Sequence, residues 1–464
     1  MEKTKKGLGV RMWFFLILIG FAGQLAWALE NMYLNTYITY LNFSAPAGQN
    51  FDYSLDIALT TAFSAIVATL TTIFMGALTD KIGHKKLFIS GGYLLWGIAT
   101  ACFGLFNVNS TSKILPIAMA SSLAALFVIV LDCIMTFFGS TSNDAAFNSY
   151  ITKNIEKENR GKAEGVLQIL PLIAMLFLFV GLNSLTTDSS SGVHDARWDL
   201  FFYIVGGFVF IMGIVSFFLI PKEKEEKSEK TYLSHLVEGF RPSVIKKNKN
   251  LYLVLLIYFL YACATQVFFP YLMVYVERTC KISNTGSGFL TPFALLMAIA
   301  LLGGSLLSVF FGILSDKLGR DKLILPSLGI FALGILLMFF VPQIASDGGR
   351  LGYGIVSGTV LILGYVGVPT ILNAIVRDDI PQGEEGSYMG VRMLFVVALP
   401  MCIGPFIGNA LNASTGEQYA NEFGDVSSVP SKYGYLVGLG VLLLSLIPSY
   451  FYFREVRKQH VAKQ

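Results

Sequence analysis

Charged residues are scarce in this sequence. They make up 14% of the 464 residues, whereas hydrophobic residues make up 54%, and the mean hydropathy is +0.63. A water-soluble domain has about 25% charged residues, so most of this chain must face lipid or other buried helices. The net charge of +4 is small and no basic run is interleaved with aromatic residues. We therefore expect no nucleic-acid partner.

Cysteine and histidine are also few. The five cysteines are scattered, mostly inside apolar runs, and no pair has the spacing of a metal site, so we expect neither a disulfide framework nor a metal. No histidine lies inside an apolar run, so a proton carrier within the membrane must be a carboxylate. No nucleophile, base or metal cluster occurs at usable spacing. We expect no enzymatic activity and no cofactor beyond a coupling ion.

Apolar runs fill most of the chain. A membrane-spanning helix needs about 20 mostly apolar residues. The sequence has twelve such runs, at about 12–40, 55–79, 87–106, 114–150, 163–184, 199–220, 251–276, 287–314, 323–341, 352–376, 388–412 and 433–453. We therefore predict an all-α membrane protein with twelve transmembrane helices.

One long charged stretch divides these runs into two sets of six. It predicts an N-terminal half over 1–220, a cytoplasmic linker over 221–250 and a C-terminal half over 251–464. With the N-terminus inside, most Lys and Arg residues fall on the inner side. The outer segments hold only Lys113, Arg197, Arg278, Lys281, Arg350 and Lys432. This excess predicts that both termini are cytoplasmic. The basic termini suit a plasma membrane.

Two internal repeats indicate a duplicated unit. A charged turn between the second and third runs returns between the eighth and ninth, with Gly76, Asp80 and Gly83 matched by Gly312, Asp316 and Gly319. The first Gly of each copy is expected to let two helices approach closely, and the second to allow a tight reversal. Further on, Asn148 to Val166 aligns without gaps with Asn373 to Val391.

Polar residues inside the apolar runs mark candidate sites, because such residues are costly in lipid. At helical spacing the first run carries Gln24, Trp27, Asn31 and Asn35 on one face, with Glu30 beside it. The fourth run carries Asp132, Thr136, Ser140 and Asn143 on one face, and Asp144 lies nearer its inner end. We predict Glu30, Asp132 and Asp144 as ion-coupling residues. The alternative is that these acids are structural hydrogen-bonding groups between packed helices.

The C-terminal half has no Asp or Glu inside a run. Its polar residues are neutral, and we take Tyr258, Tyr261, Gln266 and Asn373 as substrate-binding together with Gln24, Trp27, Asn31, Asn35, Thr136 and Asn143. Aromatic faces with amide and carboxylate partners suit an uncharged, polyhydroxylated ligand. Membrane anchoring is the alternative for the tyrosines. No cation lies deep in the runs, so an anionic substrate is disfavoured.

The repeated turn resembles the loop signature of the major facilitator superfamily, Gly-x-x-x-Asp-Arg/Lys-x-Gly-Arg/Lys-Arg/Lys. Arg320 fits the pattern in the second copy, whereas His84 stands at the same place in the first. The resemblance implies two six-helix halves about a central cavity, and a cytoplasmic gate made by these turns together with Arg160 and Arg392.

Two shorter motifs resemble the sucrose-transporter branch of the glycoside–pentoside–hexuronide:cation symporters. They are the stretch from Trp27 to Tyr37 and the pair Leu131-Asp132. The resemblance implies proton coupling and sugar binding for Asp132. The sequence departs from the branch at Glu30, Asn143 and Asn148, and its second run has only Asp56, at the outer edge, which favours protons over sodium.

The hypothesis favoured by these features is a monomeric, proton-coupled importer of a neutral sugar or glycoside that works by alternating access. One alternative is a proton-coupled exporter of drugs or metabolites, although exporters of the superfamily tend to carry a buried Arg in the fourth helix. A non-transporting membrane sensor or a lipid transporter is less favoured, because the loops leave no room for a signalling domain.

Overall fold

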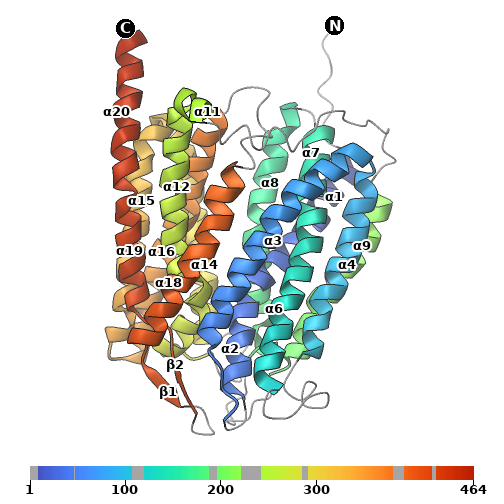
Figure 1. Ribbon diagram of the computed structural model, residues 1–464, viewed down its shortest axis with the longest axis vertical. Coiled ribbons are helices and arrows are strands. Elements are labelled where there is room, and N and C mark those ends of the chain that lie inside the picture. The colour runs from blue at the N-terminus through green and yellow to red at the C-terminus, as the bar shows by residue number, and fades with distance from the viewer. Residues whose placement is uncertain are drawn as a thin grey trace. The chain divides into compact units, whose positions relative to one another are not determined.

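The computed structural model describes residues 9–45, 48–106, 120–155, 157–187, 196–220, 242–284, 291–379, 391–420 and 425–463 (Figure 1). The described residues form two compact units. Unit 1 contains the described residues of 1–37, 70–188 and 194–231. Unit 2 contains the described residues of 38–69 and 232–464. Residues 38–69, which the sequence assigns to the N-terminal half, belong to unit 2, and the predicted halves and linker stay a prediction.

The first half of the chain has helices and no strand among its described residues. Its elements are α1 (Val10–Ala28), η1 (Leu29–Leu34), α2 (Asn35–Phe43), α3 (Tyr53–Ile82), α4 (Lys85–Cys102), η2 (Phe103–Leu105), α6 (Ala120–Gly139), η4 (Ser140–Phe147), α7 (Asn148–Asn154), α8 (Lys157–Leu176), η5 (Phe177–Leu182), η6 (Asn183–Leu185) and α9 (Trp198–Leu219). Of these, η1, η4 and η5 are π-helical, and η2 and η6 are 3₁₀ turns.

The second half adds one short β-hairpin to its helices. Its elements are α11 (Pro242–Lys247), α12 (Lys249–Phe268), η7 (Phe269–Tyr271), α13 (Leu272–Val274), η8 (Tyr275–Thr279), α14 (Pro292–Leu318), α15 (Arg320–Phe340), η9 (Val341–Gln343), α16 (Asp347–Asp379), η10 (Leu394–Ala398), α18 (Leu399–Thr415), β1 (Gln418–Ala420), β2 (Val426–Ser428), α19 (Tyr433–Leu444) and α20 (Leu446–Lys463). The strands pair antiparallel, with Tyr419 opposite Ser427.

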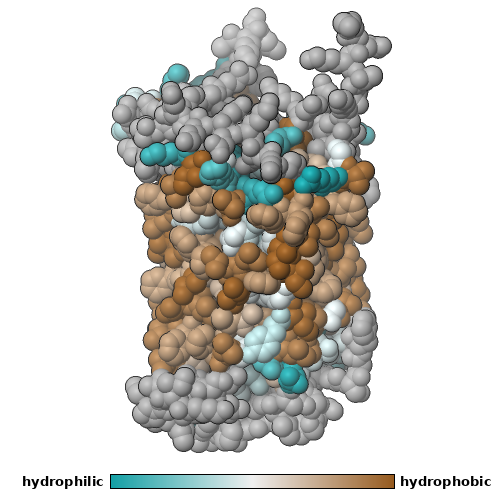
Figure 2. Space-filling model, turned by 90° about the vertical axis from the view of Figure 1, so that its right-hand side faces the viewer, coloured by the Kyte–Doolittle hydropathy of each residue, from teal (hydrophilic) through white to brown (hydrophobic). Residues whose placement is uncertain are grey.

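The predicted all-α fold with twelve membrane helices is confirmed. Within the described ranges, 10 helices are long and apolar enough to cross a membrane. Two shorter apolar helices, Ile169–Leu185 and Pro292–Leu307, stand at the predicted fifth and eighth spans. Hydrophobic side chains cover most of the face in Figure 2, and hydrophilic ones gather toward its two ends, as expected for a surface in contact with lipid.

Glycines let two helix pairs pack closely, one in each unit. In unit 1, a Cβ on Gly97 of α4 would lie 2.6 Å from the carbonyl oxygen of Gly206 in α9. In unit 2, a Cβ on Gly334 of α15 would lie 2.5 Å from the Cα of Leu361 in α16. Small residues at helix crossings increase van der Waals contact, which drives helix association where both helices and lipid are apolar.

Candidate functional site

Two acidic side chains gather in unit 1 where the first membrane helix (α1 and η1) meets the fourth (α6 and η4). Glu30 lies in η1 and is 8% exposed. Its Oε1 accepts a hydrogen bond of 3.1 Å from the hydroxyl of Thr136 in α6. Asp132 precedes Thr136 by one helical turn and is fully buried. The structure therefore places Glu30 on the same buried face of α6 that carries Asp132.

The third predicted acid, Asp144, lies in η4 within a polar network. The Ser140 hydroxyl donates to one of its carboxylate oxygens at 3.1 Å, and the amide of Asn143 donates to the other at 3.2 Å. The Oδ1 atom of Asn143 accepts a bond of 3.0 Å from the hydroxyl of Tyr93 in α4. Gly23 of α1 makes room for this pair, because a Cβ there would lie 2.7 Å from Asn143 Oδ1.

Tyr93 belongs to this network although the sequence did not single it out. It is a fully buried aromatic residue in an apolar run, and its hydroxyl also lies 2.9 Å from the carbonyl oxygen of Ile19. A tyrosine in that setting has no sequence signal that separates it from a packing residue. Only the fold shows that its hydroxyl links α4 to α1 and η4.

Trp27 belongs to a cluster of aromatic rings with Trp96 and Tyr93, and it lies close to Glu30 on the first membrane helix. Its ring centroid lies 5.0 Å from that of Trp96, and the Trp96 centroid lies 5.4 Å from that of Tyr93. Gly139 allows the two indoles to approach α6, since a Cβ there would lie 2.8 Å from Trp96 and 3.1 Å from Trp27. The predicted substrate residue Trp27 thus lies one turn from Glu30 on the same helix.

The predicted polar face of the first membrane helix does not hold over its whole length. Asn31 is exposed and Gln24 is half-buried, but Asn35 is only 5% exposed. The amides of Asn31 and Asn35 donate to carbonyl oxygens of their own helix, those of Trp27 and Asn31. Asn35 leaves the predicted polar face because η1 precedes it. A π-helical turn is wider than an α-helical one and shifts the face of every residue after it.

In unit 2, three predicted residues form one hydrogen-bonded chain. Arg392 Nε donates to Asn373 Oδ1 at 3.2 Å, and Asn373 Nδ2 donates to the Tyr258 hydroxyl oxygen at 3.3 Å. These residues come from α12, from α16 and from the helical turn that precedes η10. From the sequence, Arg392 is predicted to belong to the cytoplasmic gate, and Tyr258 and Asn373 are predicted to bind substrate. The fold brings all three into a single cluster.

The other two candidates of unit 2 are engaged within its helices. The hydroxyl of Tyr261 donates to the carbonyl oxygen of Tyr365 at 2.8 Å, and its ring lies 4.9 Å from that of Phe331. Gln266 is half-buried where α12 meets α18, and a Cβ on Gly404 would lie 2.5 Å from the Cβ of Gln266. Tyr258, Tyr261 and Asn373 thus all bond within unit 2, and their part in substrate binding stays a prediction.

The two repeated turns share a glycine with a positive φ, although the helix that follows begins one residue later in the first turn, at Lys85, than in the second, at Arg320. Gly83 and Gly319 have positive φ angles of 79° and 92°, and α3 and α14 each end two residues after the Asp of the motif. Lys85 donates a hydrogen bond to the Ser149 hydroxyl, and Arg320 donates to the carbonyl oxygen of Ala374 at 3.3 Å. The acceptor residues directly follow Asn148 and Asn373, which are equivalent in the second repeat.

One expectation for the turns was wrong. The close helix approach predicted at the first Gly is absent at Gly76, where a Cβ would meet no atom within 4 Å. The side chains of Asp80, Asp316 and Arg160 and the surroundings of Gly312 lie outside the described part of the structure, although these four residues are helical.

A further polar cluster in unit 2 was not foreseen. It ties the segment 38–69 to α18 and to the residues around the β-hairpin. The Asn412 amide donates to the Ser54 hydroxyl at 3.0 Å, and the Tyr271 hydroxyl lies 3.0 Å from the carbonyl oxygen of Ser54. The Tyr53 hydroxyl donates to the carbonyl oxygen of Ser428 at 2.7 Å. These contacts explain why the ends of α2 and α3 belong to unit 2.

The chain was compared with known protein families. The model of the Major Facilitator Superfamily matches residues 16–405, and again residues 291–463. The chain belongs to the Major Facilitator Superfamily. It is therefore a multi-pass membrane transporter of the alternating-access type, as the repeated turn had indicated, and it binds a small-molecule substrate rather than catalysing a reaction.

Solved structures of the superfamily share its fold. A mutant of the nucleoside transporter NupG aligns with a TM-score of 0.68 and 12% identity, over 95% of this chain and 99% of that one. A bacterial homologue of the human lysosomal transporter Spinster, inward-facing and occupied, aligns with a TM-score of 0.66 and 14% identity, over 97% and 98%. An inward-facing bacterial homologue of the iron transporter ferroportin aligns with a TM-score of 0.66 and 13% identity, over 95% and 97%. None of the curated proteins compared matches the chain.

No group of three or more His, Cys, Asp or Glu side chains in the described part of this facilitator is arranged to hold a metal ion. The polar clusters of the two units instead supply carboxyl, hydroxyl, amide and guanidinium groups. These groups suit proton transfer and hydrogen bonding to a ligand.

Proposed function

We propose that this transporter imports a neutral sugar or glycoside together with protons, in the manner of the sucrose-transporter-like symporters that its first and fourth helices resemble. The observation that carries the proposal is the contact between Glu30 and Thr136, one turn from the buried Asp132. It joins the two helices that bear the sequence resemblance. It also places two carboxyl groups inside one apolar bundle.

Burial makes these carboxyl groups suitable proton carriers. An ionised carboxylate in an apolar bundle is costly unless hydrogen bonds or a cation compensate it, whereas a protonated one is neutral. A cycle in which Glu30 or Asp132 takes up and releases a proton therefore changes the stability of the bundle at each step. That change gives the proton gradient a means to drive the conformational cycle. Sodium is the less favoured coupling ion, because the second apolar run carries only Asp56, at its outer edge.

The remaining polar groups favour an uncharged substrate. The Arg392 side chain already donates to Asn373, and Asn373 in turn donates to Tyr258. Hydroxyl and amide groups of this kind bind sugar hydroxyls, and an indole such as Trp27 covers the apolar face of a sugar ring. NupG is named as a nucleoside transporter, and a nucleoside is itself a neutral glycoside. Nucleosides therefore belong in the test panel beside disaccharides.

The distribution of Lys and Arg along the chain predicts its orientation in the membrane. The excess of Lys and Arg on one side predicts that both termini are cytoplasmic, and we propose a monomer in the plasma membrane. The two repeated turns would then lie on the cytoplasmic side. With their bonds from Lys85 and Arg320 to the ends of the fourth and tenth helices, they would form the cytoplasmic gate.

Uptake into proteoliposomes tests the proposal. Labelled disaccharides and nucleosides are offered under an inward proton gradient, an inward sodium gradient and no gradient. We expect accumulation of one neutral glycoside under the proton gradient alone. Sodium-driven accumulation would refute proton coupling. Proton-driven extrusion of an apolar dye without glycoside uptake would refute import and favour the exporter alternative.

Variants then assign the coupling residue. Glu30→Gln and Asp132→Asn remove one acid each with little change in volume, and we expect at least one of them to abolish accumulation while facilitated exchange of substrate remains. Asp347→Asn is the matched control, because the Asp347 side chain is 93% exposed and pairs only with Arg350 of its own helical turn among the described residues. If both acid variants accumulate substrate like the control, neither Glu30 nor Asp132 couples transport to protons.

A further inference from the structure

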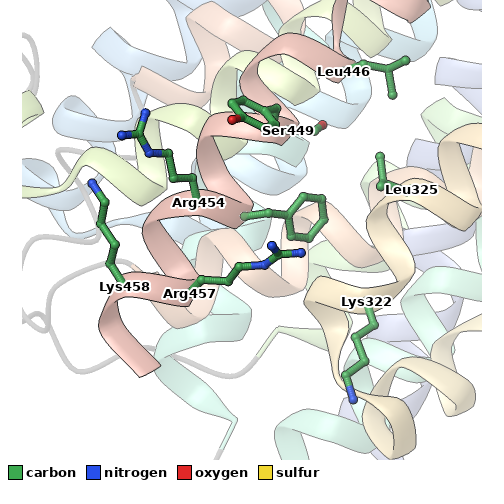
Figure 3. A pocket seen from close by; sticks show the side chains of 9 residues that line it. Lys322, Leu325, Leu446, Ser449, Arg454, Arg457 and Lys458 are labelled. Carbon is green, nitrogen blue, oxygen red and sulfur yellow. The ribbon is translucent and has the colours of Figure 1, made fainter. Parts of the chain in front are cut away.

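A pocket of about 1030 Å³ lies between α15 and α20 in unit 2 (Figure 3). Leu325 and Leu446 approach each other from the two helices at one end of it. Ser449, Tyr450 and Phe453 also line it, together with four cationic side chains: Lys322, Arg454, Arg457 and Lys458. The pocket therefore has an apolar end and a strongly basic end. It is separate from the polar clusters described above.

The order of residues along α20 matches the depth profile of a lipid leaflet. The helix presents Leu446, Tyr450 and Phe453 to the pocket before Arg454, Arg457 and Lys458. Leu446 and Tyr450 are 46% and 66% exposed, as expected for side chains that face acyl chains. The rise from Leu446 to Lys458 is about 18 Å at 1.5 Å per residue. One leaflet of a bilayer has a hydrocarbon thickness of about 15 Å.

The nearby carboxylates do not neutralise the basic end. Asp321 accepts a hydrogen bond from the Tyr452 hydroxyl at 2.6 Å. Glu455 pairs with Lys249 at 3.0 Å and with Lys458 at 3.2 Å. Across the described ranges, no carboxylate forms an ion pair with the other three cations of the pocket. An excess of positive charge thus remains beside an apolar wall.

The equivalent corner of unit 1 is built from different contacts. Lys86 is equivalent to Lys322 in the repeated turn, and its ammonium group lies 4.3 Å from the centroid of the Phe217 ring. The helix that carries Phe217 ends at Leu219, and Arg11 donates to the carbonyl oxygens of its last two residues. In unit 2 the corresponding helix continues to Lys463 and carries the additional cations.

We propose that this pocket binds one anionic phospholipid, with the phosphate held by Lys322, Arg454 and Arg457 and an acyl chain along Leu325 and Leu446. Arginine and lysine are the side chains that recognise phosphate. Basic pockets between membrane helices at the cytoplasmic surface, where the charge count places this end of α20, are typical sites for acidic headgroups. A free phosphate would use the basic end but would gain nothing from the apolar one.

Lipid binding is measured on the purified, delipidated full-length protein in detergent. Dioleoyl phosphatidylglycerol, dioleoyl phosphatidylcholine and soluble glycerol phosphate are titrated separately, and bound lipid is counted by native mass spectrometry. We expect the anionic lipid to bind with at least tenfold higher affinity than the zwitterionic one. Replacing Arg454 and Arg457 together by Gln should lower its affinity by roughly thirtyfold, from the usual contribution of each basic residue.

Two further variants complete the test. Lys322→Gln removes a cation from the opposite wall and should lower affinity by roughly fivefold, which keeps the test valid if the double variant does not fold. Lys86→Gln, at the equivalent place in unit 1, should leave lipid binding unchanged. Equal binding of the two lipids, unchanged affinity in the double variant or in Lys322→Gln, or binding of glycerol phosphate as tight as that of the lipid would each overturn the proposal. None of these measurements depends on the transported substrate.

Discussion

The hydrogen bond from Thr136 to Glu30 allows the charge of Glu30 to be tested directly. Thr136→Val keeps the shape of the side chain but removes the hydroxyl that donates to Glu30 Oε1 at 3.1 Å. A buried hydrogen bond to a charged group contributes about 1.5–3 kcal/mol, and one between neutral groups about 0.5–1.5 kcal/mol. The cost of the substitution therefore depends on whether Glu30 carries a charge.

The experiment compares this cost in two backgrounds. Thr136→Val is made in the wild-type protein and in Glu30→Gln, whose amide oxygen still accepts the bond but never ionises. The free energy of unfolding is measured by reversible denaturation in mixed micelles at about pH 5 and about pH 8. If Glu30 exchanges a proton in this range, the substitution costs about 1–2 kcal/mol more at the higher pH in the wild type. In Glu30→Gln the cost is independent of pH.

Two results would contradict this reasoning. A cost below about 0.5 kcal/mol in both backgrounds would show that the hydrogen bond does not contribute to the folded protein. A cost in the wild type that is equal at both pH values would show that Glu30 keeps one protonation state. Asp132 would then be the remaining carboxyl group of this face and the stronger candidate for the proton.

Three further substitutions test other parts of the site. Gly23→Ala places a Cβ 2.7 Å from Asn143 Oδ1, so overpacking should lower the free energy of unfolding by about 1–3 kcal/mol and reduce transport. Gly83→Ala forces an L-residue into a φ of 79°, which should cost about 1–2 kcal/mol. Asn373→Ala removes the group that links Arg392 to Tyr258, and we expect a higher KM in the uptake assay together with a loss of stability of up to about 3 kcal/mol.

Matched controls separate these effects from a general sensitivity of the helices. Gly91→Ala in α4 is the control for Gly23→Ala, because a Cβ on Gly91 would meet nothing within 4 Å. There the better helix propensity of alanine should be neutral or stabilising by up to about 1 kcal/mol. A loss of stability in Gly91→Ala equal to that in Gly23→Ala would contradict the packing argument. Thr370→Ala in α16, where the hydroxyl bonds only its own helix, is the control for Asn373→Ala.

The sequence predicted what depends on hydropathy and on a regular period. The twelve runs became membrane helices because about 20 apolar residues have few alternatives to a spanning helix. The buried face of Asp132, Thr136 and Ser140 was correctly placed on one side because α6 keeps the α-helical period up to Gly139. Asn35 does not lie on the predicted polar face, because nothing in the sequence of η1 indicates a π-helical turn.

Contacts between distant segments were the part that one sequence could not give. Arg392 and Tyr258 meet Asn373 across 19 and 115 residues, and nothing in their local sequences pairs them. The pocket between α15 and α20 was not predicted for the same reason, since the sequence alone shows its cations only as part of the positive charge on the inner side of the membrane. The two repeats located the turns correctly because duplication places the same motif twice, but the motif does not reveal that its first glycine, Gly76, is not at a close helix contact.

The bond between Asn412 and Ser54 has a consequence for biosynthesis. Its partners are 358 residues apart, so a ribosome that adds 5–20 residues per second completes the second partner roughly 20–70 s after the first. During that interval Ser54 and the neighbouring polar groups of the second helix are already in the bilayer without Asn412, and until Tyr271 is added, 217 residues after Ser54, they also lack that partner. The nascent first half therefore remains in the membrane with some polar groups unpaired. At this stage an insertase or a membrane chaperone would shield more polar groups from lipid than at any later stage.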